Sequence, residues 1–193
     1  MTKDIILMGI QGSGKGTQAK LLLEHFGEKM KYFEMGGILR ALQSTDNAIG
    51  NYLARYVPKG QLIKPAVSAW LRNVFMETLE EEDMVLWDGM LRTVEQTIQI
   101  VQKMRDKERS FVVVDLAIPD EEVYKRVAKR VNADGSHARK DDINEQAIRN
   151  RIEAFHRDTK PALEWLEEQG LLVRVDGMRS EGEIFAEILR IIN

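Results

Sequence analysis

The chain contains no cysteine, and its three histidines are scattered along 193 residues. The absence of cysteine excludes disulfides and thiolate metal sites. No apolar run approaches the roughly 20 residues that a membrane-spanning helix needs. The apolar run near the N-terminus is also too short for a signal peptide. We therefore expect a cytoplasmic protein that does not associate with membranes.

No charge of one sign dominates the composition either. The formal net charge is −3, with 44% hydrophobic and 31% charged residues, which is the balance of a soluble globular protein. A charge this small gives no overall attraction to nucleic acid or to a membrane surface. The length suits one domain with small mobile insertions.

Five short apolar runs alternate with helical patterns. The runs read as strands at residues 5–10, 31–35, 84–89, 111–116 and 171–176. Apolar residues at spacings of three and four predict helices at residues 15–25, 64–79, 94–105, 120–131, 145–168 and 181–192. Pro161 should kink or divide the helix at 145–168. Alternating strands and helices indicate an α/β fold with a parallel sheet.

The segment GIQGSGKGTQ, residues 9–18, lies between the first strand and the first helix. Its pattern GxxxxGK is formed by Gly9, Gly14 and Lys15. Glycines leave backbone N–H groups free to approach phosphate oxygens, the following helix adds its positive dipole end, and the lysine adds a mobile charge. The sequence therefore predicts a phosphate-binding loop. Gly16 stands where a metal-binding hydroxyl usually sits, so direct Mg²⁺ ligation by Thr17 is doubtful.

The strand at 84–89 carries Asp88 near its end. In proteins with such a loop, an acidic residue at that kind of strand end holds Mg²⁺, often through water. An aspartate that only forms the turn before Gly89 is the alternative. We favour the Mg²⁺ interpretation because the phosphate loop is present.

The motifs GIQGSGKGTQAKLL, GGILRA, GQLI, WDGMLRTVEQ, RVAKRV and ARKDDINEQAIRNRI resemble, in this order and spacing, those of adenylate kinases. The resemblance implies a three-layer P-loop fold with a five-stranded parallel sheet of order 2-3-1-4-5. It implies a core of residues 1–35, 64–130 and 139–193, a monophosphate-binding insertion at 36–63, and a short lid at 131–138. It also implies the reaction in which Mg-ATP and AMP give two ADP, reversibly.

The resemblance assigns roles to individual residues. The implied ATP-binding residues are Gly12, Ser13, Gly14, Lys15, Gly16, Thr17, Arg126, Arg130 and Arg179. The implied AMP-binding residues are Met35, Gly36, Arg40, Gln61, Ile63, Gly89, Arg92, Gln96, Arg139 and Arg151. The implied catalytic residues are Lys15, Arg92, Arg130, Arg139, Arg151, Asp141 and Asp142. Some members have a long lid with four metal-binding cysteines, whereas this chain resembles the short-lid type and no zinc site is expected.

Simpler interpretations stay open for several of these residues. Arg40 can be a solvated helix residue, and Arg126 and Arg130 can form a solvated basic face. Arg149 lies close enough in sequence to be confused with Arg151. Asp142 also fits a helix N-terminal capping pattern, a role that can coexist with a functional one.

The sequence departs from the family in the monophosphate half. Met35-Gly36-Gly37 replaces the usual Thr-Gly-Asp, and Met90-Leu91 replaces the usual Phe-Pro, whose proline commonly follows a cis bond. A cis bond before Leu91 would cost roughly 3–4 kcal/mol, so the turn is either trans or strained. The methionines can wall an adenine or can be ordinary core residues.

The chain offers many arginines and no general base, which suits an acceptor that is already an anion. The alternatives to an adenylate kinase are a UMP or CMP kinase on the same fold, and a P-loop nucleotide-binding protein or hydrolase with a degraded acceptor site. Thr93 favours AMP, since pyrimidine relatives usually have Asn there, and the amide of Gln96 matches the edge of adenine. We expect a monomer because a lid and an insertion must move freely.

Overall fold

A computed structural model describes residues 3–132 and 145–193 of the chain. The strands are β1 (Asp4–Met8), β2 (Met30–Glu34), β3 (Met84–Asp88), β4 (Phe111–Ala117) and β5 (Leu172–Asp176). The helices are α1 (Lys15–Phe26), α2 (Met35–Gln43), α3 (Ala48–Leu53), α4 (Pro65–Met76), α5 (Val94–Asp106), α6 (Asp120–Asn132), α7 (Glu145–Ala154), α8 (Lys160–Glu168) and α9 (Glu181–Ile192). Short turns of other helix types are η1 (Gly27–Lys29), η2 (Val57–Lys59) and η3 (Phe155–Thr159).

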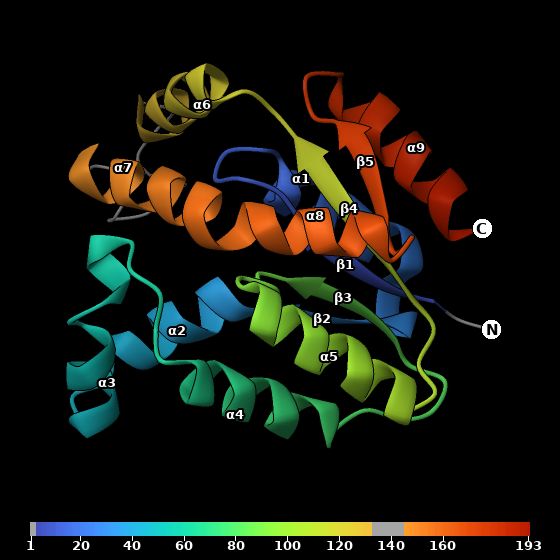
Figure 1. The fold of residues 1–193 in the computed structure, drawn as a ribbon, viewed down its shortest axis with the longest axis horizontal. Coiled ribbons are helices and arrows are strands. Elements are labelled where there is room, and N and C mark those ends of the chain that lie inside the picture. Colours follow the sequence, from blue (N-terminus) through green and yellow to red (C-terminus); the bar gives the residue numbers. More distant parts are fainter. Residues whose placement is uncertain (1–2, 133–144) are drawn as a thin grey trace.

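The five strands form one parallel sheet of order β2-β3-β1-β4-β5, which confirms the predicted order (Figure 1). β1 lies in the centre, and all five of its residues are buried. A strand buried on both faces needs apolar residues at nearly every position, which is why β1 and β3 show no alternation of polar and apolar residues. Because the sheet is parallel, the carboxyl ends of all strands meet at one edge, where Leu7 pairs with Asp88 and Met8 pairs with Asp115.

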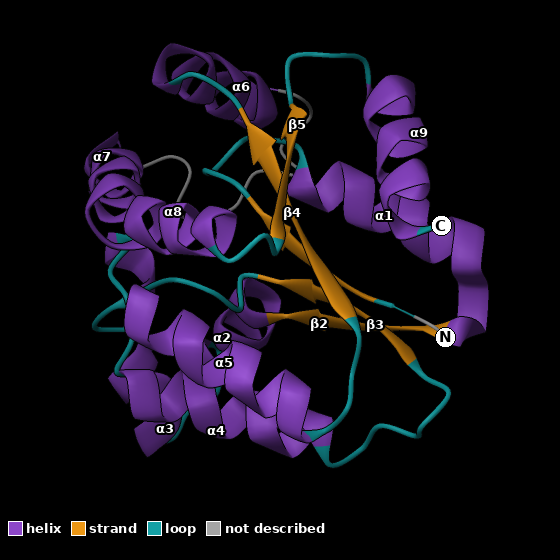
Figure 2. Ribbon diagram, turned by 45° about the vertical axis from the view of Figure 1, so that its right-hand side comes forward, coloured by secondary structure: helices purple, strands orange, loops and turns teal. Residues whose placement is uncertain are grey.

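Helices cover the sheet on both faces (Figure 2). One face packs against α1 and α9, through side chains such as Leu22 and Ile188. The other face packs against α4, α5 and α8, through side chains such as Ile100 and Leu166. This three-layer arrangement buries the apolar side chains of both sheet faces and leaves the carboxyl edge of the strands for ligands.

Residues 36–63 are largely helical and contain most of α2, all of α3, and η2 (Figure 1). The side chain of Asn47 accepts hydrogen bonds from the N–H groups of Ile49 and Gly50, and so caps α3. Leu53, on α3, is fully buried. That these residues form a separately moving insertion stays a prediction.

The long helix predicted at 145–168 is divided, as expected from Pro161. α7 and α8 are joined by the π-helical turn η3. Proline has no N–H to donate and its ring crowds the preceding turn, so regular α-helical bonding cannot pass through residue 161. The division separates α7, which lies near η2, from α8, which packs on the sheet.

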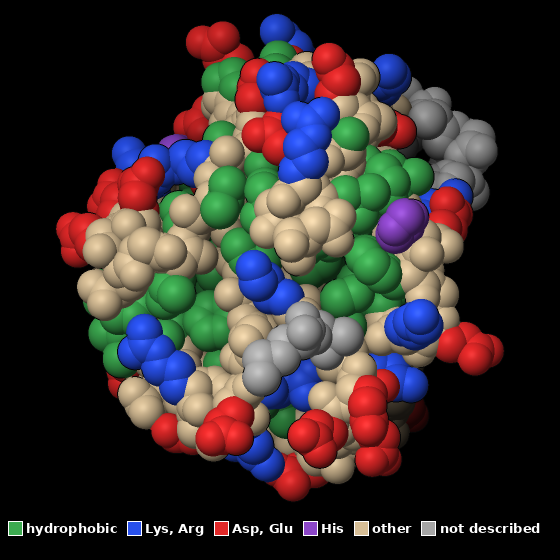
Figure 3. Space-filling model, turned by 90° about the vertical axis from the view of Figure 1, so that its right-hand side faces the viewer, with side chains coloured by type: hydrophobic (Ala, Val, Ile, Leu, Met, Phe, Trp, Pro, Cys, Tyr) green, Lys and Arg blue, Asp and Glu red, His purple; other side chains and the backbone are tan. Residues whose placement is uncertain are grey.

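Positive and negative side chains are interspersed on the face that carries α9, as the small net charge leads one to expect (Figure 3). Among the described residues, no helix combines the length and the apolar character needed to cross a membrane.

Candidate nucleotide-binding site

The loop between β1 and α1 has the backbone of a phosphate cradle. Gly9, Gly12 and Gly14 all have positive φ, at 135°, 81° and 102°. A side chain at Gly9 would start 2.5 Å from Oγ of Ser13 and 2.7 Å from the carbonyl oxygen of Leu116, so only glycine fits this turn. Gly14 precedes α1 without a side-chain cap, and the first turn of α1 carries no acidic residue. The helix N-terminus is therefore open to an anion.

Lys15 folds back over this loop. Its Nζ donates to the carbonyl oxygens of Gly9 and Ile10, at 2.8 and 3.0 Å, and lies 3.5 Å from Oγ of Ser13. The ammonium group of Lys15 is thus held at the loop by hydrogen bonds to carbonyl oxygens. The oxygens of a bound phosphate can replace these carbonyl oxygens as its hydrogen-bond partners. Ser13 is fully buried, and Thr17 is half-buried in the first turn of α1.

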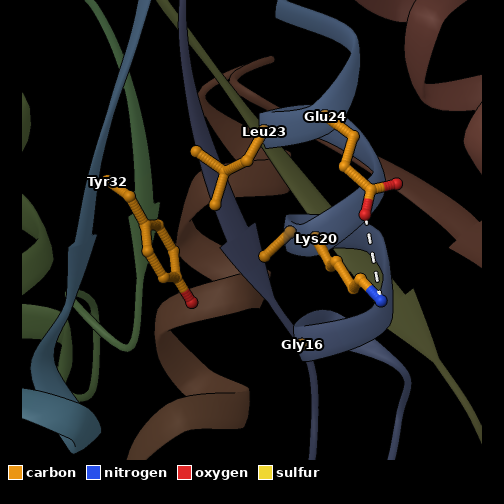
Figure 4. A pocket seen from close by; sticks show the side chains of 6 residues that line it. Gly16, Lys20, Leu23, Glu24 and Tyr32 are labelled. Carbon is orange, nitrogen blue, oxygen red and sulfur yellow. Dashed lines mark ion pairs between the residues drawn. The ribbon is translucent and has the colours of Figure 1, made fainter. Parts of the chain in front are cut away.

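A pocket of about 370 Å³ lies between α1 and Tyr32 of β2 (Figure 4). Lys20 lines it and pairs with Glu24 at 3.8 Å along the helix. Of the predicted site residues only Gly16 borders this pocket, so it is a surface hollow beside the phosphate loop and not the candidate site itself.

Arg126, on α6, is anchored beside the phosphate loop. Its Nε donates to Glu122 at 2.9 Å, its Nη2 donates to the carbonyl oxygen of Gly177 at 2.9 Å, and its Nη1 lies 3.5 Å from the carbonyl oxygen of Gly12. A simple solvated basic face is therefore the wrong interpretation for Arg126, because the guanidinium is tied to two loops at the carboxyl edge of the sheet. The neighbouring Lys125 also lies near Glu122, at 4.0 Å.

Arg151 and Arg149, only two positions apart on α7, point in different directions. Arg151 donates to Oε1 of Gln11 in the phosphate loop at 3.2 Å. It also packs against η2, since a side chain at Gly60 would start 2.8 Å from Cγ of Arg151. Arg149 instead pairs with Glu145 and is largely exposed. Arg151 therefore lies between the phosphate loop and the segment that the sequence assigns to the acceptor. Gln11 was not predicted as a site residue.

Arg92 and Met35 meet at Gly89, directly after β3. A side chain at Gly89 would start 3.4 Å from Nη2 of Arg92 and 3.6 Å from Cβ of Met35. The carbonyl group of Arg92 accepts a hydrogen bond from Oγ1 of the buried Thr159 at 3.1 Å. Thr159 belongs to η3, so the turn that divides the long helix also holds the Arg92 segment. No local pattern identifies Thr159 as a support for Arg92, because 67 positions separate them.

Arg40, on α2, pairs with Glu34 at the end of β2, with 2.8 Å between Nη2 and Oε1. It is therefore not simply a solvated helix residue. Both side chains are only partly exposed, at 32% for Arg40 and 28% for Glu34. Glu34 lies next to Asp88 in the sheet register. The sequence analysis did not assign a role to Glu34.

Thr93 and Gln96 begin α5. Oγ1 of Thr93 accepts a hydrogen bond from the N–H of Gln96 at 3.2 Å, which makes Thr93 the N-cap of the helix. Gln96 is the third residue of α5 and is half-buried. That it faces a base stays a prediction. Ile63 is buried in the segment before α4, whereas Gln61 is exposed.

Comparison with known proteins places the chain in a family. A family model described as "Adenylate kinase" matches residues 7–171. The chain belongs to the adenylate kinase family. Curated relatives named adenylate kinase include one from Leptospira biflexa, 33% identical over 194 residues, with 98% of this chain and 100% of the relative covered. Others are from Methanosarcina barkeri, 30% identical over 215 residues, and Phocaeicola vulgatus, 28% identical over 187 residues, with 98% and 96% of both chains covered.

Two departures from the adenylate kinase pattern have a structural explanation. No cis peptide bond occurs in the described residues, so the bond before Leu91 is trans and the turn has relaxed. Met35, Met90 and Leu91 belong to one buried core cluster with Trp87. These side chains fill the core on the α4, α5 and α8 side of the sheet.

Two carboxyl groups lie at the carboxyl edge of the central strands. Asp88 is 8% exposed and Asp115 is 4% exposed. Burial raises the pKa of Asp115, while the charges of Arg174 and Lys15 act to lower it. Within residues 3–132 and 145–193, no three His, Asp or Glu side chains are grouped so that they could hold a metal ion alone. A single carboxylate such as Asp88 fits a water-mediated contact to a Mg²⁺ ion whose main ligands are nucleotide phosphates.

The remaining predicted residues are placed as follows. Arg130 belongs to α6. Arg179 follows β5, is exposed, and pairs with Glu187 of α9, which keeps it near the loop that Arg126 contacts. Arg139, Asp141, Asp142 and positions 133–138 of the predicted lid lie outside the described residues.

Proposed function

We propose that this protein is an adenylate kinase, which transfers the γ-phosphoryl group of Mg-ATP reversibly to AMP and yields two ADP. The proposal rests on membership in the family and on one geometric observation. Arg151 contacts Gln11 of the phosphate loop while packing against Gly60 of the segment assigned to the acceptor. A cation between donor and acceptor is what phosphoryl transfer between two anions requires.

ATP binds with its outer phosphates in the loop at residues 9–15, under the open N-terminus of α1. Lys15 exchanges its carbonyl partners for phosphate oxygens, because a charge-assisted bond to phosphate is stronger than one to a neutral carbonyl group. Arg126 lies beside this loop and is available to the base or to the phosphates.

AMP binds on the side of Arg40 and Arg92, with its base near Gln96. Its phosphate is already an anion at neutral pH, since the second pKa of such a group is about 6. The acceptor oxygen needs no general base; it needs its charge screened and its position held in line with the γ-phosphorus. Arginine side chains suit this work because their planar fork matches phosphate oxygens.

Mg²⁺ is expected to bind together with ATP. When bound, the ion would neutralise part of the charge of the nucleotide phosphates. Asp88 is the residue we assign to it, through water. No zinc site is proposed.

The segments 36–63 and 131–138 are proposed to close over the two nucleotides. Closure excludes water, which would otherwise compete as acceptor of the phosphoryl group. Structures with and without a bisubstrate analogue should differ at these segments. A monomeric state and a cytoplasmic location also stay predictions, which sedimentation and cell fractionation can test.

The decisive experiment is to measure ADP formation from ATP with AMP, UMP, CMP and GMP as acceptors at equal concentrations. AMP should be the fastest acceptor. Faster use of UMP or CMP would replace the proposal with a pyrimidine nucleotide kinase. ATP hydrolysis without any transfer to a nucleotide would indicate a degraded acceptor site.

A further inference from the structure

Glu34 forms an ion pair with Arg40, the arginine that we assign to the acceptor phosphate. Its Oε1 accepts a hydrogen bond from Nη2 of Arg40 at 2.8 Å. The two residues are close because β2 ends at Glu34 and α2 begins at once, so one and a half turns of helix bring Arg40 back over the strand end. A carboxylate and a phosphate offer an arginine the same kind of planar, charge-assisted contact.

Gly37 makes room for this contact. A side chain at position 37 would start 2.7 Å from Oε2 and 3.1 Å from Cδ of Glu34. Any residue larger than glycine must therefore displace the carboxylate of Glu34. The adenylate kinase family usually has Asp at this place. An Asp side chain at position 37 would displace the carboxylate of Glu34, so the Glu34–Arg40 contact depends on glycine here.

The Glu34–Arg40 ion pair allows an anionic ligand to replace Glu34 as the partner of Arg40. Both side chains keep about a third of their surface exposed, at 28% for Glu34 and 32% for Arg40. Solvent screening makes such a pair weak, equivalent to at most about a fivefold change in an equilibrium constant. An AMP phosphate with two negative charges can therefore displace the carboxylate of Glu34 from Arg40, whereas an anion with less charge displaces it poorly.

The surroundings of Glu34 strengthen the competition. Asp88 lies next to Glu34 in the sheet register, so a second negative charge is close to the same strand ends. An incoming phosphate meets an arginine whose charge is already partly neutralised, in a region that carries two carboxylates. The partial neutralisation of Arg40 and the nearby carboxylate charges both make the affinity for the acceptor phosphate lower than it would be with Arg40 alone.

We propose that Glu34 tunes the affinity of the acceptor site: its carboxylate competes with the acceptor phosphate for Arg40 and so weakens acceptor binding. This inference rests on the proposed function, because it takes Arg40 as a ligand of the AMP phosphate.

The test is calorimetric titration of AMP into the full-length protein without ATP, so that the readout does not depend on turnover. Glu34→Gln removes the competing charge at nearly constant shape and should lower the Kd for AMP about two- to fivefold. Gly37→Ala keeps the charge but displaces the carboxylate of Glu34 from its present position, and should lower the Kd for AMP in the same direction. The double variant should gain little beyond either single change, since both remove one contact.

Three controls separate the possible results. Glu164→Gln, at an exposed position of α8, makes the same change in net charge and should leave the Kd for AMP unchanged. The Kd for ATP should be unchanged in all these variants. Arg40→Gln should raise the Kd for AMP at least about tenfold, because a charge-assisted contact to phosphate is lost.

If Arg40→Gln weakens AMP binding while Glu34→Gln leaves it unchanged or weakens it, Glu34 is not a competitor and the proposed function stands. If Arg40→Gln leaves AMP binding unchanged, the acceptor site itself is wrongly assigned. If Glu34→Gln tightens binding but Glu164→Gln does so equally, the effect is one of net charge and the inference about the contact fails.

Discussion

The ammonium group of Lys15 donates a hydrogen bond to the carbonyl oxygen of Gly9 at 2.8 Å, across the phosphate loop. Gly9 adopts a φ of 135°, and its lack of a side chain is what allows the loop to turn sharply against Ser13 and Leu116. The lysine is therefore placed at the loop by backbone carbonyl oxygens, whose positions depend on the glycine.

Lys15→Met should reduce turnover at least about 100-fold, because it removes a charge-assisted contact to the phosphate that is being transferred. The rate of ADP formation measures this, with circular dichroism to confirm folding. Lys20→Met, on the exposed side of α1, is the matched control and should keep near-normal activity. Near-normal turnover of a folded Lys15→Met protein would contradict the phosphate-loop assignment.

Gln96→Ala should weaken the use of AMP by about 1–3 kcal/mol in kcat/KM, because the base edge is then desolvated without its hydrogen-bond partner. The apparent affinity for ATP should change much less. Gln99→Ala, at an exposed position of the same helix, is the control. Unchanged AMP kinetics in Gln96→Ala would remove Gln96 from the acceptor site.

Arg109→Met should destabilise the protein by about 3–5 kcal/mol, because it leaves the carboxylate of Asp4 buried without its counter-charge. Asp4 is 1% exposed, and Arg109 donates to both of its carboxyl oxygens, at 2.9 and 2.8 Å. Urea unfolding followed by circular dichroism measures the loss. Trp87, whose Nε1 donates to the same carboxylate, also makes tryptophan fluorescence a second probe.

The double variant Asp4→Asn/Arg109→Met should be less destabilised than Arg109→Met, since it buries no lone charge. A double variant that is equally or more destabilised would show that Arg109 contributes through packing and not through its charge. Activity per folded molecule should stay near normal in both, because this cluster lies at the end of the sheet opposite the phosphate loop.

Asp115→Asn should stabilise the ligand-free protein at neutral pH. Burial raises the pKa of Asp115 above its ordinary value of 3.8, with Glu167 acting in the same direction, so the folded protein holds this proton more tightly than the unfolded chain. The resulting stability is fully present below the unfolded pKa and is lost as pH rises through the folded pKa. Asparagine cannot ionise and avoids this loss.

Thermal unfolding of both proteins between about pH 4 and pH 8 measures the difference, which should grow with pH. Asp46→Asn, at an exposed position, should show no such trend. A stability difference that does not depend on pH would mean that the pKa of Asp115 is not raised in the folded state above its value in the unfolded chain.

Much of the fold could be predicted from short-range patterns. The strands at β1, β3 and β4 are continuous apolar runs, and the phosphate loop is a local motif between a strand and a helix. The division of the long helix at Pro161 also follows from one residue, because the cause is the missing N–H of proline. The strand order was obtained from the resemblance and not from the pattern of the strands, since periodicity carries no information about which strands are neighbours.

Contacts between distant segments were not predictable in this way. The resemblance to the family favoured Arg151 over Arg149, but it did not show where either side chain lies. The packing of α7 shows Arg151 against the phosphate loop and Gly60. The hydrogen bond from Thr159 to Arg92 joins positions 67 residues apart, and the pairing of Arg109 with Asp4 joins positions 105 residues apart. Neither pair lies within one turn or one strand, so no local spacing indicates it.

The sequence by itself therefore determined the phosphate loop, the alternation of strands and helices, and the family, because each depends on residues that are close along the chain. The tertiary structure decided which charged groups face one another. It placed Arg151 between Gln11 and Gly60, and it set Glu34 against Arg40 over Gly37. The physical reason is that electrostatic and hydrogen-bond partners are chosen by distance in space, which chain order does not fix until the sheet and its helices have packed.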